Sequence, residues 1–454
     1  MQCDPVRRST QAGCSDGRAM KLPRRSPRFL LATILIIAFC LRVGVLLLRS
    51  LHSARFLDVD SHGYLRLSRN LDAFVSKSNP LFSLGLNRTP VYPVYLFVTH
   101  HITDSQLVGP MLLQVLLGVG VVYVTYRLGL SLFSQPVGLC AAAILAIDPL
   151  SILYSSVVLT EALFTLFLTA SVLMFWRPSG NNWRRGLAAG VLLGLATLTR
   201  PVSIYLAVPL AVAYLIVERN SLRKAALVAV CFLVGFGVPT GAWIIRNYET
   251  TGLTAISSVQ GINLLYYRAA GALVESEHIS LSAARARLRR QLDRKLPPNA
   301  NPGQIAQAEQ TLGITVIRGH LTGYSKEVLA GGGRLLFGDA HSQLRTVTGA
   351  SVSRLLVAYS LAYLFGIYLL SAVGLWLAWR RHHLRNCVFP VMTIAYAIIV
   401  SSGEEAYSRF RMPIMPFLAL IAAVGAAALL GRIKRDSDRG ASADADEHPV
   451  LTAQ

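Results

Sequence analysis

The sequence predicts an all-α polytopic membrane protein, and three observations lead to this fold class. Hydrophobic residues make up 53% of the 454 residues and charged residues only 15%, whereas about a quarter of a soluble globular protein is charged. Apolar runs of about 20 residues, long enough to cross a bilayer, recur along the chain. The net charge of +21 collects in short loops and tails, which is typical of a membrane protein with basic cytoplasmic loops.

The first apolar run, Phe29–Leu48, follows a basic polar tail. It is too long for the core of a signal peptide and no small-residue cleavage site follows it, so we expect a retained transmembrane helix. Further runs bring the expected total to about ten helices, with flanking residues needed for the shortest to cross. These runs are Val108–Tyr126, Val137–Leu153, Val157–Trp176, Leu187–Leu198, Val202–Val217, Ala225–Ile245, Leu355–Trp379, Val388–Val400 and Pro413–Leu430.

Basic residues predict how the chain is oriented. The short loops Arg177–Arg185, Glu218–Lys224 and Arg380–Arg385 each contain three Lys or Arg residues, and so does the stretch that begins at Arg432. Short cytoplasmic loops collect Lys and Arg. We therefore expect both termini inside, in the cell (inner) membrane, and two long segments outside.

This orientation divides the chain into parts. The expected parts are a basic cytoplasmic tail (1–27), a membrane domain (28–435) that contains the outer segments 51–107 and 246–353, and a disordered cytoplasmic tail (436–454). Both outer segments are expected to contain amphipathic helices. In the second, Leu281, Ala284, Leu288 and Leu292 form an apolar stripe among arginines, which predicts an amphipathic helix lying on the membrane surface.

Two other kinds of site are not supported by the sequence. No basic stripe lies outside the short loops and tails, so no nucleic-acid partner is expected. Of the six cysteines, Cys3 and Cys14 lie in the N-terminal tail and the other four lie inside apolar runs, which leaves no disulfide framework or cysteine metal site. His100 and His101 are a weak metal candidate, because adjacent residues on a helix point apart and no third ligand is evident.

Polar residues near the helix ends gather on the side that the topology places outside. Charges at membrane depth cost several kcal/mol and are kept when they pair or perform a function. The clustering therefore predicts a polar cavity that opens outward. The residues concerned are Asp58, Asp60, Tyr64, Arg88, Tyr92, Glu161, Arg200, Arg246, Arg409 and Arg411.

Each of these residues also has an ordinary structural interpretation. On position alone, Asp58 or Asp60 is more often a solvated loop carboxylate or a helix N-cap than a catalytic group. The arginines could reach out to lipid headgroups, and Tyr64 and Tyr92 could be interfacial belt aromatics. The clustering on one face, rather than any single residue, therefore supports a functional site.

Four stretches, in this order, resemble the type C superfamily of membrane glycosyltransferases, with the closest likeness to protein O-mannosyltransferases and to bacterial aminoarabinose and galacturonic acid transferases. The likeness runs from about Leu31 to Leu430. The stretches are DSHGYLRLSRNL, NRTPVYPVYLF, LTEALFTLFL with GLATLTRP, and YSRFRMPIMPFLAL. In one respect the chain departs from the pattern: many members have Asp-Glu in the first loop, whereas here Ser61 follows Asp60 and the second carboxylate is Asp58.

The resemblance implies a hexosyl- or pentosyltransferase that uses a polyprenyl-phosphate-linked sugar, with Asp60 as the catalytic residue. The acceptor could be a glycan, a lipid or a protein, and the segment 246–353 is the expected place for its recognition. The other residues of the cluster are expected to bind substrate. Arg409 and Arg411 are two positions apart and point in different directions on a helix, so we expect only one of them to hold the phosphate.

The chemistry of such a transfer fits these residue types. Breaking the sugar–phosphate bond adds a charge to the phosphate, which arginines stabilise by bidentate hydrogen bonds. The acceptor hydroxyl needs a base, for which a carboxylate is suited, and a one-step displacement inverts the anomeric centre. No metal is required, although a divalent metal could take part. The alternative is a lipid or solute transporter or flippase, but we find neither polar residues at the bilayer midplane nor an internal repeat.

Overall fold

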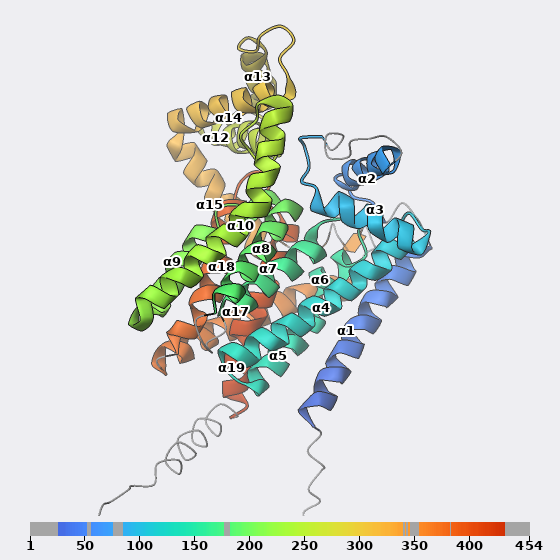
Figure 1. The fold of residues 1–454 in the computed structure, drawn as a ribbon, viewed down its shortest axis with the longest axis vertical. Helices are drawn as coiled ribbons and strands as arrows, with labels where there is room; N and C mark the ends of the chain where they lie inside the picture. Colours follow the sequence, from blue (N-terminus) through green and yellow to red (C-terminus); the bar gives the residue numbers. More distant parts are fainter. Residues whose placement is uncertain are drawn as a thin grey trace, which may run out of the picture.

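The computed structural model describes residues 26–51, 56–75, 85–176, 182–338, 341, 344–345, 354–381 and 383–431. Every regular element in these ranges is a helix, so the all-α fold class is confirmed. Nearly all of the expected N-terminal tail and all of the expected C-terminal tail lie outside the described residues. Figure 1 shows a bundle of membrane-length helices below, with shorter helices standing above it.

Within the described ranges, six helices are long and apolar enough to cross a membrane, and three shorter ones are also apolar. This shows an integral membrane protein but does not confirm the number ten. The long helices are α1 (Pro27–Ser50), α4 (Val108–Leu132), α10 (Leu222–Thr251), α17 (Arg354–Arg380), α18 (Leu384–Ser401) and α19 (Met415–Leu429), the last continuing η6 (Ser408–Ile414). The shorter are α5 (Gln135–Ala146), α7 (Glu161–Trp176) and α9 (Ala207–Val217), and α8 (Trp183–Thr199) corresponds to the remaining run.

Three expected runs are not continuous α-helices, and the run Val202–Val217 becomes α-helical only at Ala207. The run Val137–Leu153 breaks after α5, where the Asp148 carboxylate accepts a hydrogen bond from Ser151 N–H (2.9 Å) and begins the short helix α6 (Pro149–Tyr154). The run at Val157 becomes helical only at Glu161. Before that, Val158 N–H donates to Phe56 O (2.9 Å), which ties this stretch to the first outer segment.

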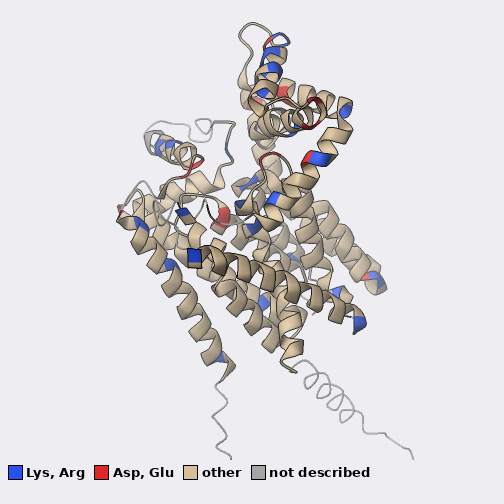
Figure 2. Cartoon of the chain, turned by 180° about the vertical axis from the view of Figure 1, so that it is seen from behind, with Lys and Arg blue, Asp and Glu red and all other residues tan. Residues whose placement is uncertain are grey.

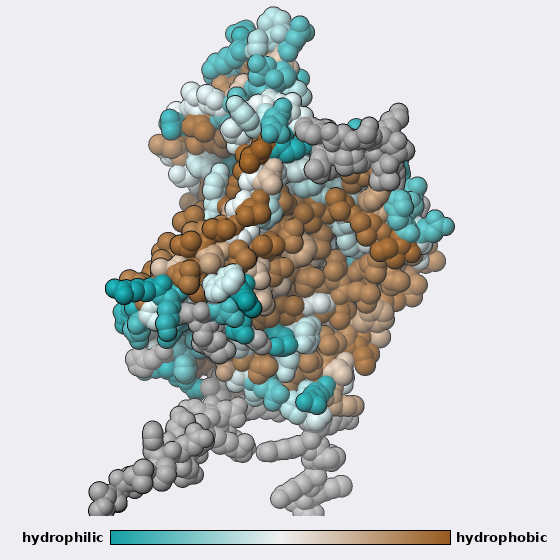
Figure 3. Space-filling view, viewed as in Figure 1, coloured by the Kyte–Doolittle hydropathy of each residue, from teal (hydrophilic) through white to brown (hydrophobic). Residues whose placement is uncertain are grey.

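Close helix packing holds the bundle together. A Cβ atom added at Gly190 of α8 would lie 2.0 Å from Phe232 O of α10, so only glycine permits this approach. Small residues at helix contacts are typical of membrane proteins. Figure 2 shows charged residues concentrated in the upper part and at the lower helix ends, and Figure 3 shows the apolar band between them.

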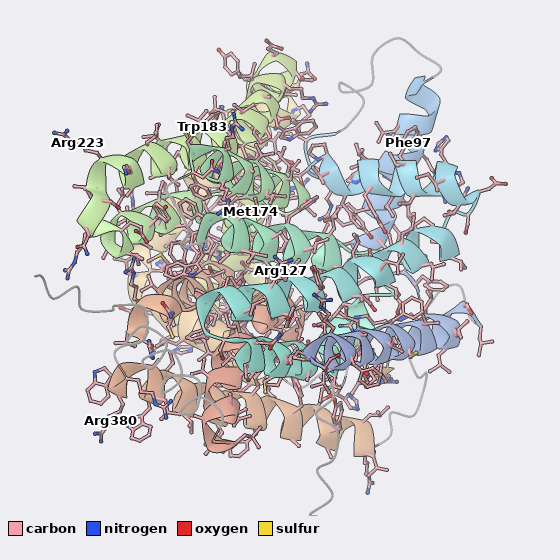
Figure 4. The ribbon with its side chains drawn as sticks, turned by 60° about the horizontal axis from the view of Figure 1, so that its bottom comes forward. Phe97, Arg127, Met174, Trp183, Arg223 and Arg380 are labelled. Atoms are coloured by element: carbon pink, nitrogen blue, oxygen red, sulfur yellow. The ribbon has the colours of Figure 1, made fainter. Side chains whose placement is uncertain are left out.

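Polar contacts bring the end of α4, the end of α9 and the start of α18 together at one end of the bundle. Arg385, at the start of α18, forms an ion pair of 2.7 Å with Glu218 at the end of α9. Asn386 Nδ2 donates to Leu132 O at the end of α4 (2.6 Å). Figure 4 shows Arg223 and Arg380 projecting outward at this end. The two predicted inner loops at Glu218–Lys224 and Arg380–Arg385 therefore lie together.

The outer segments are helical where they are described. The first contains α2 (Ser61–Val75) and α3 (Val91–Thr103). The second contains α11 (Val259–Asn263), the π-helix η5 (Leu264–Ala269), α12 (Ala270–Glu277), α13 (Leu281–Asp293), α14 (Pro302–Gly319) and α15 (Leu321–Phe337). The remaining short elements are the 3-10 turns η3 (Pro201–Ser203) and η4 (Arg219–Ser221).

The placement predicted for the basic helix α13 is wrong. Its stripe residues Ala284, Leu288 and Leu292 are buried in a cluster with Leu273 of α12 and Leu312 of α14. Figure 1 shows α13 at the top of the molecule, above the upper end of α10. The apolar stripe of an amphipathic helix does not reveal whether lipid or protein covers it, and here neighbouring helices cover it.

Candidate active site

A cavity of about 1380 Å³ lies where the first outer segment, the end of α10, α11 with η5, and the turn before α19 meet. Its walls contain most of the residues predicted from the sequence. These are Asp58, Asp60, Tyr64, Arg88, Arg200, Arg246 and Arg409. The predicted residues Tyr92, Glu161 and Arg411 do not line the cavity.

Asp60 lies between two arginines. Its Oδ1 is 2.7 Å from Arg88 Nη2, and its Oδ2 is 3.1 Å from Arg409 Nη1. Burial acts to raise the pKa of Asp60, but Arg409 and Arg88 stabilise the carboxylate, and the pKa lies below its ordinary value. The Asp60 side chain remains 35% exposed, so it can meet a ligand in the cavity as an ionised group.

Glu161 is the buried carboxylate that holds two of the arginines of the cavity. Its side chain is fully buried at the start of α7, and its Oε1 contacts both Arg409 Nε and Arg200 Nη1, the latter at 2.8 Å. A buried carboxylate needs such partners because an unpaired charge is costly to bury. Glu161 therefore positions two cavity arginines and does not itself face the cavity.

Asp58 has a more local role. Its Oδ1 accepts a hydrogen bond from Val59 N–H (2.6 Å), and its Oδ2 is 3.8 Å from Arg409 Nη1. Ser61, the residue after Asp60, accepts a hydrogen bond from Asp58 N–H and donates to Val158 O, both at 2.8 Å. The serine thus fixes the loop that presents Asp60.

A chain of aromatic contacts orients Arg88. The guanidinium carbon of Arg88 lies 4.8 Å from the centre of the Tyr64 ring, and Tyr64 meets Tyr92 edge to face at 5.1 Å. Tyr92 is fully buried and donates to Gln114 Oε1 (3.0 Å), whose amide in turn donates to Val157 O (2.7 Å). Tyr92 is therefore a supporting residue, and sequence reasoning missed Gln114 although it is a polar side chain inside an apolar run.

The structure separates Arg409 from Arg411. Arg411 Nη1 donates to Leu335 O and Leu336 O, each at 2.8 Å, and so closes the C-terminal end of α15. Arg409 faces the cavity, where its Nη1 also donates to Tyr407 Oη (3.0 Å). Of the two arginines, only Arg409 is placed to meet a substrate.

Two more arginines lie in the far wall of the cavity. Arg246 Nη1 donates to Asn247 Oδ1 (2.9 Å), and its guanidinium packs 4.8 Å from the Trp243 ring centre. Arg268, missed by sequence reasoning, forms an ion pair with Glu405 (3.2 Å) from the π-helix η5. An arginine inside the apolar stretch LLYYRAAGALV was the available signal, and π-helical turns are frequent at functional sites.

The carboxylates of the site do not form an evident metal centre. In the described parts of the chain, no three His, Cys, Asp or Glu side chains are grouped closely enough to hold a metal ion. Asp58, Asp60 and Glu161 each contact an arginine, so a divalent ion here would have to displace a guanidinium. The residues present therefore fit an anion between arginines better than they fit a metal ion.

Comparison with known proteins agrees with this description. Residues 87–243 match the family model described as dolichyl-phosphate-mannose-protein mannosyltransferase, a range that contains Arg88, Tyr92, Glu161 and Arg200. No curated protein sequence matches the chain significantly.

Solved structures show the same fold. The oligosaccharyltransferase of Archaeoglobus fulgidus in the apo form has a TM-score of 0.55 at 14% identity, over 91% of this chain and 52% of that chain. The same enzyme tethered to an acceptor peptide with the NVT sequon has a TM-score of 0.50 at 13% identity, over 87% and 49%. The chain thus spans about half the length of that enzyme. ArnT from Cupriavidus metallidurans, in the apo state, has a TM-score of 0.37 at 15% identity, over 88% and 76%, which is too distant for comparison.

The chain is an all-α membrane protein whose fold is similar to that of the oligosaccharyltransferase, and the mannosyltransferase family model matches about a third of it. Both likenesses agree with the resemblance to type C membrane glycosyltransferases that the sequence motifs indicate.

Proposed function

We propose that the protein transfers a sugar from a polyprenyl-phosphate-linked donor to an acceptor hydroxyl at the outer face of the cell (inner) membrane. The observation that carries the proposal is the position of Asp60, an ionised carboxylate held between Arg88 and Arg409 in the wall of a large cavity. The type C fold and the matched mannosyltransferase family model support it.

The donor phosphate binds among Arg409, Arg88 and Arg200. These arginines come from separate elements, and the guanidinium of Arg200 lies 4.7 Å from the centre of the Phe410 ring. A second, small cavity of about 20 Å³ adjoins Arg200 and is lined by apolar residues that include Leu168, Val202 and Leu206.

Asp60 acts as the general base. It accepts the proton of the acceptor hydroxyl as that oxygen forms a bond to the anomeric carbon of the donor. The bond between the anomeric carbon and the phosphate oxygen breaks, and its electron pair leaves with the phosphate. Displacement from the opposite face inverts the anomeric centre.

Before the donor binds, Asp60 is paired with Arg88 and Arg409, and donor binding changes the basicity of Asp60 through these ion pairs. A donor phosphate competes with Asp60 for Arg88 and Arg409, because both anions use the same guanidinium groups. Losing part of this pairing raises the basicity of Asp60 at the stage when a base is needed. Glu161 keeps Arg409 and Arg200 in place throughout.

The proposed reaction does not require a metal ion. The arginines supply the positive charge that the leaving phosphate needs, and the acceptor is a glycan, lipid or protein outside the membrane. Undiminished transfer after treatment with EDTA agrees with this part of the proposal, and a rate restored only by added divalent metal contradicts it.

The experiment that tests the function compares envelope glycoconjugates by mass spectrometry in cells with and without the protein. We expect one glycoconjugate class to lose a sugar residue, to recover it with the wild-type gene, and not to recover it with Asp60→Asn. Asp293→Asn is the matched control, because this exposed carboxylate on α13 pairs with the neighbouring Arg289 and does not line the cavity. Identical glycoconjugates in all strains would contradict the proposal.

A further inference from the structure

Part of the cavity lies away from Asp60, between the end of α10, α11 with η5, and α14. Three carboxamide side chains line this part of the cavity, which we call the lobe: Gln260 and Asn263 from α11, and Gln310 from α14. All three are partly buried. None of them has a side-chain hydrogen bond to another described residue, although other amides of the site, such as Gln114, are fully bonded.

Helix packing holds these amides in place. A Cβ atom added at Gly261 would lie 2.7 Å from Ala306 O, so α11 and α14 are in close contact there. Gln310 is one turn along α14 from Ala306 and lies on the same face of that helix. The three carboxamides are therefore presented by two tightly packed helices rather than by a loose loop.

The lobe is joined to the catalytic end of the cavity. Ser258 Oγ, just before α11, donates to Asn87 Oδ1 (2.6 Å), and Ser258 N–H donates to Leu86 O (3.0 Å). Asn87 directly precedes Arg88, the partner of Asp60. A ligand in the lobe can therefore extend to the reacting atoms.

The size of the cavity leaves room for a second substrate. Pockets for a single small ligand measure about 300–1,000 Å³, whereas this cavity measures about 1380 Å³. The charge of Arg268 in the wall is already paired with Glu405. The other groups that can meet a ligand there are the three amides, the hydroxyls of Thr250 and Thr254, the Tyr267 ring and the guanidinium of Arg246.

These groups indicate the chemistry of the ligand. Each carboxamide has two N–H donors and one oxygen acceptor, and partly buried polar groups are normally hydrogen-bonded. A sugar ring offers several hydroxyls that both donate and accept, so it can satisfy neighbouring amides together. An extended peptide is often bound along a strand edge, and the described walls of the lobe contain no strand.

We infer that the acceptor is a glycan, and that Gln260, Asn263 and Gln310 bind the sugar residue that receives the transfer. This inference rests on the proposed transferase function, and it assigns the acceptor class that the function leaves open.

Ligand binding to the purified full chain in nanodiscs tests the inference without any transfer step. Saturation-transfer NMR would compare a panel of neutral hexose oligosaccharides of different linkage, hexuronic-acid oligosaccharides, and a peptide rich in Ser and Thr. We expect oligosaccharides of the panel, but not the peptide, to bind to the wild type and to Asp60→Asn alike. Losing two hydrogen-bonding amides in Gln260→Met/Asn263→Leu should weaken binding about tenfold or more.

Gln310→Met removes the amide that α14 contributes to the lobe. This single variant keeps the inference testable if Gln260→Met/Asn263→Leu does not fold. Gln307→Met is the matched control, because Gln307 lies on the same helix but is exposed and donates to Gly252 O (3.2 Å). Binding of the peptide alone, or full affinity in the double variant and in Gln310→Met, would overturn the inference. Transfer by Asp60→Asn at the wild-type rate would instead overturn the proposed catalytic role and leave this binding result intact.

Discussion

The guanidinium of Arg409 lies 3.1 Å from the carboxylate of Asp60, although 349 positions separate the two residues in the sequence. The contact joins the loop after α1 to the turn before α19, and the opposite edge of the same guanidinium rests on Glu161. The two ends of the membrane domain thus meet at the charge cluster to which we assign catalysis.

Lysine at position 409 should impair transfer more than lysine at position 411. Arg409→Lys keeps the positive charge but cannot contact Asp60 and Glu161 together, because the planar fork is lost. Arg411→Lys can still donate to the carbonyls at the end of α15. Transfer rates of the two purified variants, normalised to folded protein, provide the comparison. Equal rates, or a larger loss at 411, would count against Arg409 as the phosphate ligand.

The acid limb of the pH profile should respond to Arg88. The folded-state pKa of Asp60 is lowered, so the stability from its ion pairs is fully present above its unfolded value of about 3.9 and is lost as pH falls through the folded value. Wild-type kcat/KM should therefore stay high at mildly acidic pH. Arg88→Gln removes one partner and should move the acid limb to higher pH. An unchanged acid limb would show that another group controls it.

Removing the Glu161 carboxylate should destabilise the protein and weaken donor binding. Breaking a buried ion pair by deleting one partner costs about 3–5 kcal/mol, because the other charge stays buried. Glu161→Ala should therefore lower Tm and raise the donor KM. Glu161→Gln, which can still accept hydrogen bonds from Arg200 and Arg409, should be milder in both. A Glu161→Ala protein with wild-type Tm and wild-type donor KM would show that Glu161 does not position Arg200 and Arg409.

The predicted topology can be tested directly. We expect a reporter fused at Asn299, between α13 and α14, to report the outer side, and one at the C-terminus to report the cytoplasm. Reporters on the same side would contradict the outer placement of the segment 246–353. They would also contradict the proposal that the site opens to the outer side.

Much of the site could be predicted because charges are rare in apolar sequence. Arg88, Arg200 and Arg409 stand out next to membrane-length runs, and the structure brings all three into contact with Asp60 or Glu161. The sequence could not separate Arg409 from Arg411, because that depends on the direction each side chain takes in η6. It also could not show that Tyr92 and Glu161 support the cavity from behind, since burial depends on the tertiary packing.

The fold was predictable to a similar degree. The apolar runs correspond to helices, but Asp148 and Pro149 interrupt one of them with an N-cap and a Pro at the first helical position, a local signal that run length alone does not register. The position of α13 depended on which neighbour covers its apolar stripe, and only the folded structure supplies that information.

Transfer by purified Asp60→Asn protein, measured beside its binding of the donor lipid, tests the central claim most directly. Asparagine keeps the shape of the side chain but cannot accept the proton, and general-base catalysis contributes about a hundredfold to ten-thousandfold. We expect transfer to fall by that factor while the donor still binds, and Asp58→Asn to lose less. Transfer by Asp60→Asn at close to the wild-type rate would contradict the account and make Asp58 or Glu161 the next candidate base.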